Sequence, residues 1–354
     1  MSKLFEPFSV RDLTIANRVW VSPMCQYSSV DGLPNDWHLM HLGQFAAGGA
    51  GLVMTEASAV VPEGRISPQD AGIWNDEQAR AWRRVTEFVH AQDSVAGMQL
   101  AHAGRKGSTY RPWDGKRTSV PPEEGGWQAV GPDDRAFGGY DAPRPLTEEE
   151  AGRLPGQFAA AARRAVDAGF DLVELHFAHG YLVHEFYSPL SNDRTDRYGG
   201  DFEGRTRLAV EITGAVRAEL GDGVPLFARL SSSDWDDDGW TIEDTVRLAG
   251  LLKEHGVDLI DASSGGNTPH PQIPLGPGYQ VPFAERVRAE AGIPTGAVGM
   301  ITEPGQAEKI ISSGSADAVF LARALLREPH WPLRAASELG AEIRWVDQYA
   351  RARA

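Results

Sequence analysis

The chain has 354 residues, of which 42% are hydrophobic and 23% charged, and its 34 Lys and Arg against 49 Asp and Glu give a net charge of −15. This composition is typical of a globular protein, and the negative charge, without any basic run, argues against nucleic acids and anionic membrane surfaces as partners. No run of about 18 apolar residues is present, so we expect no membrane span, no signal peptide and a cytoplasmic location. The single cysteine, Cys25, excludes an intrachain disulfide and a cysteine-rich metal site.

Eight short apolar runs alternate with helical patterns along the chain, as in a series of βα units. Most of the runs are almost continuously apolar, as expected of parallel strands buried on both faces. Eight such units fit a closed (β/α)8 barrel, formed by residues 1–354 as a single α/β domain, better than the alternative of an open doubly wound sheet. We predict strands at residues 19–23, 52–56, 95–100, 172–176, 226–230, 258–262, 294–298 and 318–321.

Helices are predicted between these strands. Thr147 followed by Glu150 is a capping-box pattern that marks the start of one of them, and Gly169 marks its end. The predicted helices cover residues 76–92, 148–168, 202–219, 241–255, 283–291 and 303–312.

Three segments lie outside the βα repeat. The first sixteen residues are expected to form an N-terminal cap, and a C-terminal tail of about residues 335–354 is expected to make subunit contacts. Residues 111–145 hold six Gly and six Pro, so no helix can run through them. They form either a mobile linker or, as we favour, a long loop after the third strand that covers the barrel mouth.

Polar and titratable residues follow several predicted strands, and the carboxyl ends of barrel strands meet at one mouth. His176 and His179 can face the same side only if the chain turns after the strand, which Gly180 permits. Two imidazoles at one mouth could donate two N–H bonds to a developing oxyanion, or bind a metal with His102 or Asp261 as further ligands. They could also be two separately paired histidines.

The last strands and the fifth strand suggest an anionic ligand. Gly299 and Arg323 follow strands seven and eight, where barrel enzymes often bind phosphate. Arg229 ends the apolar fifth strand, where it would face a cofactor that gains electron density or would pair with an acidic residue in 234–238. Each alternative remains open from the residues alone.

Several motifs occur together and in order. They are NRV and SPMC in residues 17–25, QLAHAGRK in 99–106, HFAHGY followed by LVHEF in 176–186, and SPLSN through RYGG in 188–200. They resemble the Old Yellow Enzyme family of FMN-dependent ene-reductases over residues 4–327. The pair Cys25 and Tyr27, with QYAR at 348–351, is most similar to the thermophilic-like bacterial subgroup.

The resemblance implies that FMN lies in the barrel mouth. It places Cys25 near the reactive edge of the flavin, Gln99 at the pyrimidine ring, Arg229 where the reduced ring carries negative charge, and Arg323 at the phosphate. Ala322 stands where many relatives have glycine, so we expect a negative φ there. The implied FMN-binding residues are Ser22, Pro23, Met24, Cys25, Ala57, Gln99, Arg229, Ser264, Gly299, Ala322 and Arg323.

The resemblance also implies a reaction. NADPH or NADH would reduce FMN and leave, in a ping-pong cycle, and the reduced flavin would pass a hydride to the C=C bond of an activated alkene. His176 and His179 would bind the carbonyl oxygen of the alkene, and Tyr181 would give a proton to its α-carbon. Tyr27 and Lys106 would line the substrate pocket, and Arg351 would reach a neighbouring subunit in a homodimer or homotetramer.

Two other functions are compatible with the same barrel. A metal-dependent hydrolase would use His176 and His179 as ligands, whereas the family resemblance implies no metal. A non-catalytic flavin-binding protein would have no use for both histidines and Tyr181 together.

Overall fold

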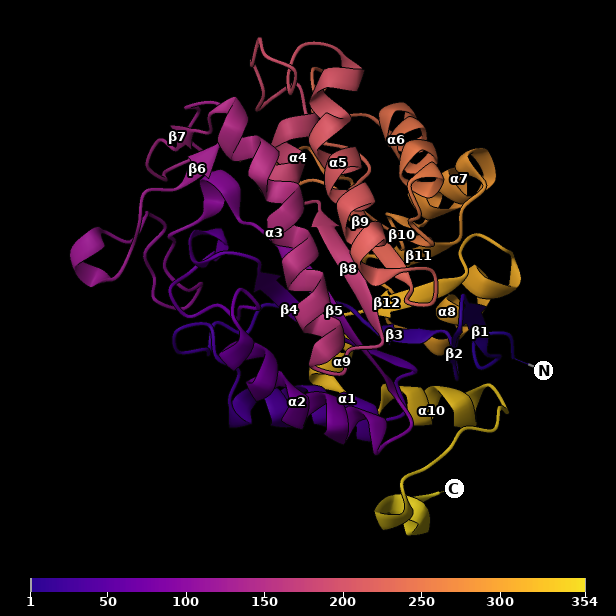
Figure 1. Cartoon of the computed structure of the whole chain (residues 1–354). Coiled ribbons are helices and arrows are strands. Elements are labelled where there is room, and N and C mark those ends of the chain that lie inside the picture. Colours follow the sequence, from indigo (N-terminus) through magenta and orange to yellow (C-terminus); the bar gives the residue numbers. More distant parts are fainter. Residues whose placement is uncertain (1, 354) are drawn as a thin grey trace.

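The computed structural model describes residues 2–353. Eight parallel strands close into a barrel in the order β3-β4-β5-β8-β9-β10-β11-β12 and back to β3, with helices around the outside (Figure 1). The predicted (β/α)8 barrel is therefore confirmed. The strands are β3 (Val19–Val21), β4 (Leu52–Ala59), β5 (Val95–Ala101), β8 (Leu172–Phe177), β9 (Leu226–Ser231), β10 (Leu259–Ser263), β11 (Thr295–Val298) and β12 (Ala318–Leu321).

The outer helices include all six that were predicted, each close to its predicted limits. Figure 1 shows α3 and α5 side by side over β8, and their facing residues pack together. Thr147 caps α3 as expected, since its hydroxyl accepts a hydrogen bond from the Glu150 amide at 3.1 Å and the Glu150 carboxylate accepts one from the Thr147 amide at 2.8 Å. These six are α2 (Asp76–His90), α3 (Glu148–Asp167), α5 (Phe202–Leu220), α6 (Ile242–Glu254), α7 (Val281–Ala291) and α8 (Pro304–Ser312).

Other helices were not predicted. The longest of them, α1, is capped by the Asn35 side chain, which accepts a hydrogen bond from the Trp37 amide at 2.9 Å. Three shorter ones lie after β8 and in the last part of the chain. The four are α1 (Asp36–Ala47), α4 (Leu182–Tyr187), α9 (Arg323–Arg327) and α10 (Trp331–Glu338).

The amino end of the barrel is closed by apolar side chains. A hairpin of β1 (Phe8–Val10) and β2 (Leu13–Ile15) packs there and forms the expected N-terminal cap. The ring of Trp20 stacks on Phe227 at a centroid distance of 5.9 Å and meets Phe320 edge-on at 5.3 Å. We refer to the cluster around these rings as the apolar plug, and its members include Phe8, Ile15, Trp20, Leu52, Leu172, Phe227, Leu259 and Phe320.

Residues 111–145, here called the lid loop, follow the third barrel strand. The loop holds the short strands β6 (Val130–Gly131) and β7 (Arg144–Pro145) and the turn η3 (Pro122–Glu124). The Trp113 ring meets Tyr27 at a centroid distance of 5.6 Å, and the Phe137 ring lies 4.7 Å from the Lys106 ammonium. Because Tyr27 and Lys106 follow barrel strands, the loop covers part of the mouth, as the lid interpretation requires.

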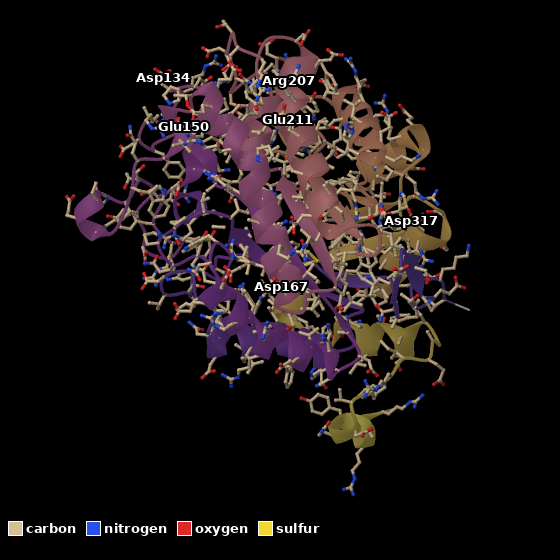
Figure 2. The ribbon with its side chains drawn as sticks, in the orientation of Figure 1. Asp134, Glu150, Asp167, Arg207, Glu211 and Asp317 are labelled. Carbon is tan, nitrogen blue, oxygen red and sulfur yellow. The ribbon has the colours of Figure 1, made fainter. Side chains whose placement is uncertain are left out.

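The chain ends in a short 3-10 turn, η4 (Asp347–Ala352), which Figure 1 shows at the end of a tail that leaves α10 and projects from the barrel. Charged side chains such as Glu150, Asp167 and Asp317 lie around the outside of the barrel (Figure 2). Within residues 2–353, no helix has both the length and the apolar character needed to span a bilayer.

Candidate functional site

His176 and His179 come together at the carboxyl end of β8. After the strand the backbone turns through left-handed conformations at His179 and Gly180, with φ of +60° and +67°. The two imidazole rings then lie at a centroid distance of 5.2 Å, nearly perpendicular to each other. A Cβ on Gly180 would meet the Gly266 carbonyl oxygen at 2.1 Å, so only glycine fits at this point of the turn.

Three side chains from other parts of the chain hold the backbone of this turn. The His179 amide donates to the Ser231 hydroxyl at 2.8 Å, and the Gly180 amide donates to Nδ1 of His184 at 2.8 Å. The Lys106 ammonium donates to the His179 carbonyl at 2.6 Å. The amides of His179 and Gly180 and the carbonyl of His179 are therefore all paired, which fixes the backbone that carries the His179 ring.

Within residues 2–353, one nitrogen of each imidazole has no hydrogen-bond partner. Nδ1 of His176 accepts from the Ala178 amide at 3.3 Å, and Nε2 of His179 lies 2.7 Å from the Ser263 hydroxyl. Burial, followed by the Arg229 charge, holds the pKa of both histidines well below the ordinary value, so both are neutral at pH 7. The arrangement leaves Nε2 of His176 and Nδ1 of His179 available to a ligand.

Tyr181 completes the cluster. Its ring lies 5.1 Å from that of His176, and the Lys106 ammonium lies 4.7 Å from its centre. Burial, followed by the nearby Cys25 and Asp70, holds the pKa of the phenol well above its ordinary value. The phenol therefore keeps its proton at neutral pH.

Lys106, predicted to bind substrate, has two backbone partners. Besides the His179 carbonyl, its ammonium donates to the Gly266 carbonyl at 2.9 Å. Burial lowers the pKa of Lys106 to about 8. Its contacts link the histidine turn to the lid loop, and a role toward substrate stays a prediction.

The segment after β3 carries Cys25 and Tyr27. The Gln26 amide between them donates to the buried Glu56 carboxylate at 2.9 Å, which fixes the backbone at this point. Burial, together with the Asp70 and Glu56 charges, raises the pKa of the Cys25 thiol well above its ordinary value, so the sulfur is a thiol and not a thiolate. Ser22, Pro23 and Met24 precede it at the same end of the barrel, and Ala57 lies in β4.

Gln99 and Arg229 lie inside the barrel at its carboxyl end. The Gln99 amide donates to the Glu174 carboxylate at 2.8 Å, and Nε of Arg229 lies 2.8 Å from the Asp261 carboxylate. The ion-pair partner is thus Asp261 and not an acid of residues 234–238, as the alternative interpretation had suggested. Among residues 2–353 the Gln99 side chain makes a hydrogen bond only through its nitrogen, and the guanidinium of Arg229 meets Asp261 through Nε without hydrogen-bond geometry, which leaves the Gln99 carbonyl and the terminal nitrogens of Arg229 to a ligand.

A cavity of about 380 Å³ lies beside strands β11 and β12. Gly299 lines it with a φ of +115°, and a Cβ there would meet the Gln280 side chain at 2.8 Å. Ala322 has a φ of −114°, so the expected negative φ is confirmed, and Arg323 is exposed beside it. Backbone amides and one guanidinium around a cavity of this kind suit a phosphate group.

Sequence reasoning missed some residues of this cavity and misplaced none of its strands. Ser263, Tyr279 and Gln280 line the cavity, whereas the Ser264 hydroxyl is used by Gln280 and by the Trp235 indole. The predicted FMN-binding residue was Ser264, whereas the adjacent Ser263 lines the cavity. Alternation of side chains along β10 is the signal that distinguishes them.

Two predicted groups lie elsewhere. Arg351 is on η4, in the projecting tail, and is not brought to the mouth of this chain. His102 accepts from the Gly104 amide at 3.1 Å and stays apart from the histidine pair, so it does not complete a three-ligand set. Across residues 2–353, no three His, Cys, Asp or Glu side chains are arranged to hold a metal ion.

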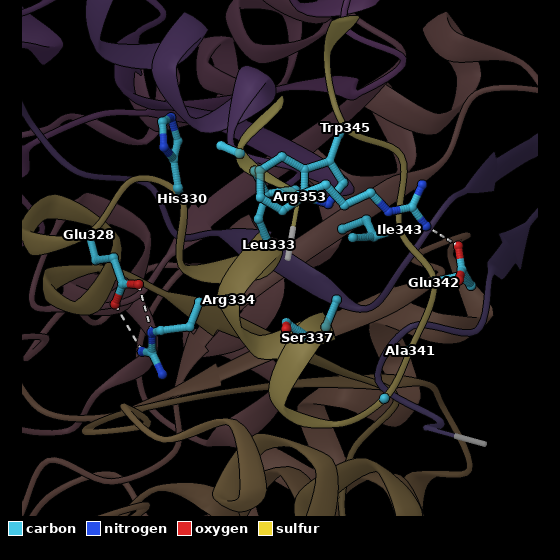
Figure 3. A pocket seen from close by; sticks show the side chains of 13 residues that line it. Glu328, His330, Leu333, Arg334, Ser337, Ala341, Glu342, Ile343, Trp345 and Arg353 are labelled. Carbon is cyan, nitrogen blue, oxygen red and sulfur yellow. Dashed lines mark hydrogen bonds and ion pairs between the residues drawn. The ribbon is translucent and has the colours of Figure 1, made fainter. Parts of the chain in front are cut away.

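A larger cavity of about 590 Å³ lies between α10 and the C-terminal tail (Figure 3). Leu333, Ile343 and Trp345 line it, together with the ion pair of Arg334 and Glu328, whose Nε and Oε1 are 2.7 Å apart. None of its lining residues is a predicted site residue. The chemically equipped site is therefore the barrel mouth and not the larger cavity.

The unpaired groups at the mouth fit FMN. A flat ring system with alternating donors and acceptors matches the free Gln99 carbonyl and the free guanidinium nitrogens of Arg229. The adjoining cavity at Gly299 and Arg323 suits the terminal phosphate. These groups lie on one end of one barrel, so a single FMN can engage all of them.

Comparison with known proteins agrees with this chemistry. Residues 3–342 match the NADH:flavin oxidoreductase / NADH oxidase family. The NADPH dehydrogenase of Geobacillus thermodenitrificans is 46% identical over 351 residues, covering 98% of each chain, and that of Bacillus subtilis is 46% identical over 352 residues, covering 99% of this chain and 98% of the other.

Solved structures are also similar. Morphinone reductase in complex with tetrahydroNAD superposes with a TM-score of 0.78 at 28% identity, over 97% of this chain and 92% of that one. The old yellow enzyme homologue from Zymomonas mobilis gives a TM-score of 0.77 at 27% identity, over 98% and 95%. The chain thus belongs to the NADH:flavin oxidoreductase / NADH oxidase family, in its Old Yellow Enzyme group, and is an NAD(P)H-dependent flavin oxidoreductase with FMN as its cofactor.

Proposed function

We propose that the enzyme reduces the C=C bond of activated alkenes, such as α,β-unsaturated carbonyl compounds, nitroalkenes or quinones. The observation that carries the proposal is the cluster of His176, His179 and Tyr181, in which the rings of His179 and Tyr181 lie at centroid distances of 5.2 Å and 5.1 Å from that of His176. FMN, once reduced by NAD(P)H, supplies the hydride. The protein residues supply substrate binding and the proton.

The two neutral histidines can act on the substrate oxygen. Nε2 of His176 and Nδ1 of His179 are the nitrogens without protein partners, and each can carry the single proton of a neutral imidazole. Two N–H donors on one carbonyl or nitro oxygen stabilise the negative charge that develops there as the β-carbon accepts a hydride. In this tautomer of His179, Nε2 accepts the hydrogen bond from the Ser263 hydroxyl.

Tyr181 is suited to deliver the proton. Its raised pKa keeps it protonated at neutral pH, and its position beside His176 brings the phenol next to a substrate held by that residue. The α-carbon, next to the carbonyl group, becomes basic once the β-carbon has accepted a hydride, so a phenol is a sufficient acid.

Anaerobic half-reactions test the proposal. We expect the Tyr181→Phe holoenzyme to be reduced by NADPH at the wild-type rate but to reduce 2-cyclohexen-1-one about 100-fold more slowly, because only the second step needs the acid. Tyr110→Phe, at a half-buried phenol that directly precedes the lid loop and donates to Glu124, is the matched control and should leave both rates unchanged. Equal losses in both half-reactions of Tyr181→Phe would refute the assignment.

We also propose that the C-terminal tail contributes to a homodimer or homotetramer, with Arg351 near the site of a neighbouring subunit. The projection of the tail and the exposure of its residues support this proposal. Sedimentation of the full chain and of a chain ending at residue 340 tests it. A smaller species for the shorter chain is expected, and identical assemblies would contradict it.

A further inference from the structure

Two carboxyl groups lie inside the barrel directly below the mouth. Glu174 on β8 and Asp261 on β10 are both fully buried. Gln99 from β5 is in register with Glu174, and Arg229 from β9, the strand between β8 and β10, is in register with Asp261 and with His176, so these groups form one layer of buried polar side chains. His176 follows Glu174 by two residues and is the titratable group next along the same face of β8.

The contacts leave part of each acid without a partner. Gln99 donates to one oxygen of Glu174, and the other oxygen, Oε2, has no hydrogen-bond partner within residues 2–353. Asp261 forms an ion pair through Oδ2 with Nε of Arg229 at 2.8 Å, but neither of its oxygens has a hydrogen-bond partner in the described part of the chain. Nothing in the ene-reduction scheme uses either acid.

The charges of this layer do not balance if both acids are ionised. Among the described residues that face the pair, Arg229 is the one cation, because Gln99 is uncharged and the lowered pKa of His176 keeps that ring neutral. A second carboxylate buried without a counterion is very costly, so the pair keeps one proton. Burial, and then Asp261, raise the pKa of Glu174, while burial raises that of Asp261 against the opposing effect of Arg229.

Arg229 has to serve both the acids and the cofactor. This step rests on the proposed placement of FMN against Gln99 and Arg229. NAD(P)H passes two electrons and one proton to FMN as a hydride and leaves as NAD(P)+, so FMN gains one hydrogen and one negative charge. The Arg229 charge is then shared with reduced FMN, and its hold on the Asp261 carboxylate weakens.

We propose that Glu174 and Asp261 form a carboxyl pair that holds one proton while FMN is oxidised and takes up a second proton from solvent when FMN is reduced. In this step a carboxylate and a solvent proton become a carboxylic acid, and no group other than NAD(P)H and FMN changes oxidation state. The pair thereby keeps the charge of the site constant through the redox cycle.

Proton uptake measures this directly. FMN-loaded enzyme in weakly buffered solution at pH 7 is reduced anaerobically with one equivalent of NADPH, and a pH-indicator dye reports the protons consumed. We expect about one proton per FMN for the wild type, and about one for Glu174→Gln and for Asp261→Asn alone, since either remaining carboxyl can accept it. The double variant should take up none.

Glu185→Gln is the matched control, because Glu185 is also a fully buried acid but pairs with the Arg105 amide outside this layer. It should take up a proton like the wild type. If the double variant does not fold, the infrared difference between reduced and oxidised wild type still tests the pair through a new carboxylic acid C=O band. That band should shift in each single variant.

Failure of the carboxyl-pair proposal and failure of the proposed function would give different results. No proton uptake by a wild type that NADPH reduces fully and an alkene reoxidises would overturn the carboxyl pair and leave the proposed function intact. Uptake that persists in the double variant would also overturn it, because the proton would then go to FMN itself. A holoenzyme that NADPH reduces but no activated alkene reoxidises would contradict the proposed function instead.

Discussion

The two ends of the barrel are built by the same strands and hold opposite kinds of side chain. On β9, Phe227 lies in the apolar plug, and Arg229, two residues later on the same face, lies at the mouth. On β10, Leu259 and Asp261 show the same change. One step of about 6.6 Å along a strand therefore separates a layer that stabilises the fold from a layer equipped for chemistry.

The difference has a physical reason. At the amino end the hairpin and the rings of Trp20 and Phe320 exclude water, and apolar burial there stabilises the barrel. At the carboxyl end buried charges cost stability, and they are retained where a ligand can use them. The comparison implies that substitutions at one end change stability and substitutions at the other change cofactor binding and proton chemistry.

The largest effect is expected in the plug. Trp20→Ala removes a fully buried indole, and we expect it to lower the free energy of unfolding by about 3–5 kcal/mol. Denaturant unfolding measures it. Trp113→Ala, at a ring that is 60% exposed, is the control and should cost less than about 1 kcal/mol. Similar losses for the two variants would break the comparison.

At the mouth, side chains on the same strands should determine how tightly FMN binds. Arg229→Met removes the free guanidinium nitrogens, and we expect FMN to bind about 10- to 150-fold more weakly, since a hydrogen bond to a charged group contributes about 1.5–3 kcal/mol. Fluorescence titration of the apoprotein with FMN gives the dissociation constant. Arg80→Met, on the exposed face of α2, should bind FMN as the wild type does. Unchanged binding by Arg229→Met would place the flavin elsewhere.

The smallest effect concerns pH. Because the folded protein raises the pKa of Glu174, the unfolded chain loses that proton first, and the stability of the apoprotein falls as pH rises above about 4.3. Glu174→Gln removes this loss. Its stability relative to wild type should therefore increase by at least about 1.4 kcal/mol between pH 4.5 and pH 7.5, as measured by urea unfolding.

Glu285→Gln, at an exposed carboxyl on α7, is the control for this pH series and should follow the wild type. A Glu174→Gln variant that parallels the wild type at every pH would show that the buried carboxyl ionises freely in the folded state. The conclusion that one of the two buried acids keeps its proton would then be wrong.

Much of the fold could be predicted because its signals are local. Each barrel strand is a short apolar run, and most helices begin at a recognisable cap such as Thr147. Helix α1 was missed for a local reason as well. It buries His38 and His41 and exposes Trp37 and Met40, so its sequence does not show the usual apolar stripe.

The site could be predicted only in part. Residues that follow strands, such as His176 and Arg323, could be assigned to the mouth because strand ends meet there. The partners that set their chemistry could not, since Arg229 pairs with a residue 32 positions away and His179 with one 84 positions away. Such pairs depend on how the strands are ordered and registered around the closed barrel.

The most direct test of the mouth as the reactive site is the binding of a phenolate, which presents one anionic oxygen to the two imidazole donors. Titration of the holoenzyme with 4-nitrophenolate should give a dissociation constant about 10- to 150-fold higher for His176→Ala than for the wild type, because one hydrogen bond to a charged oxygen is lost. Equal affinity in the two proteins would contradict the account.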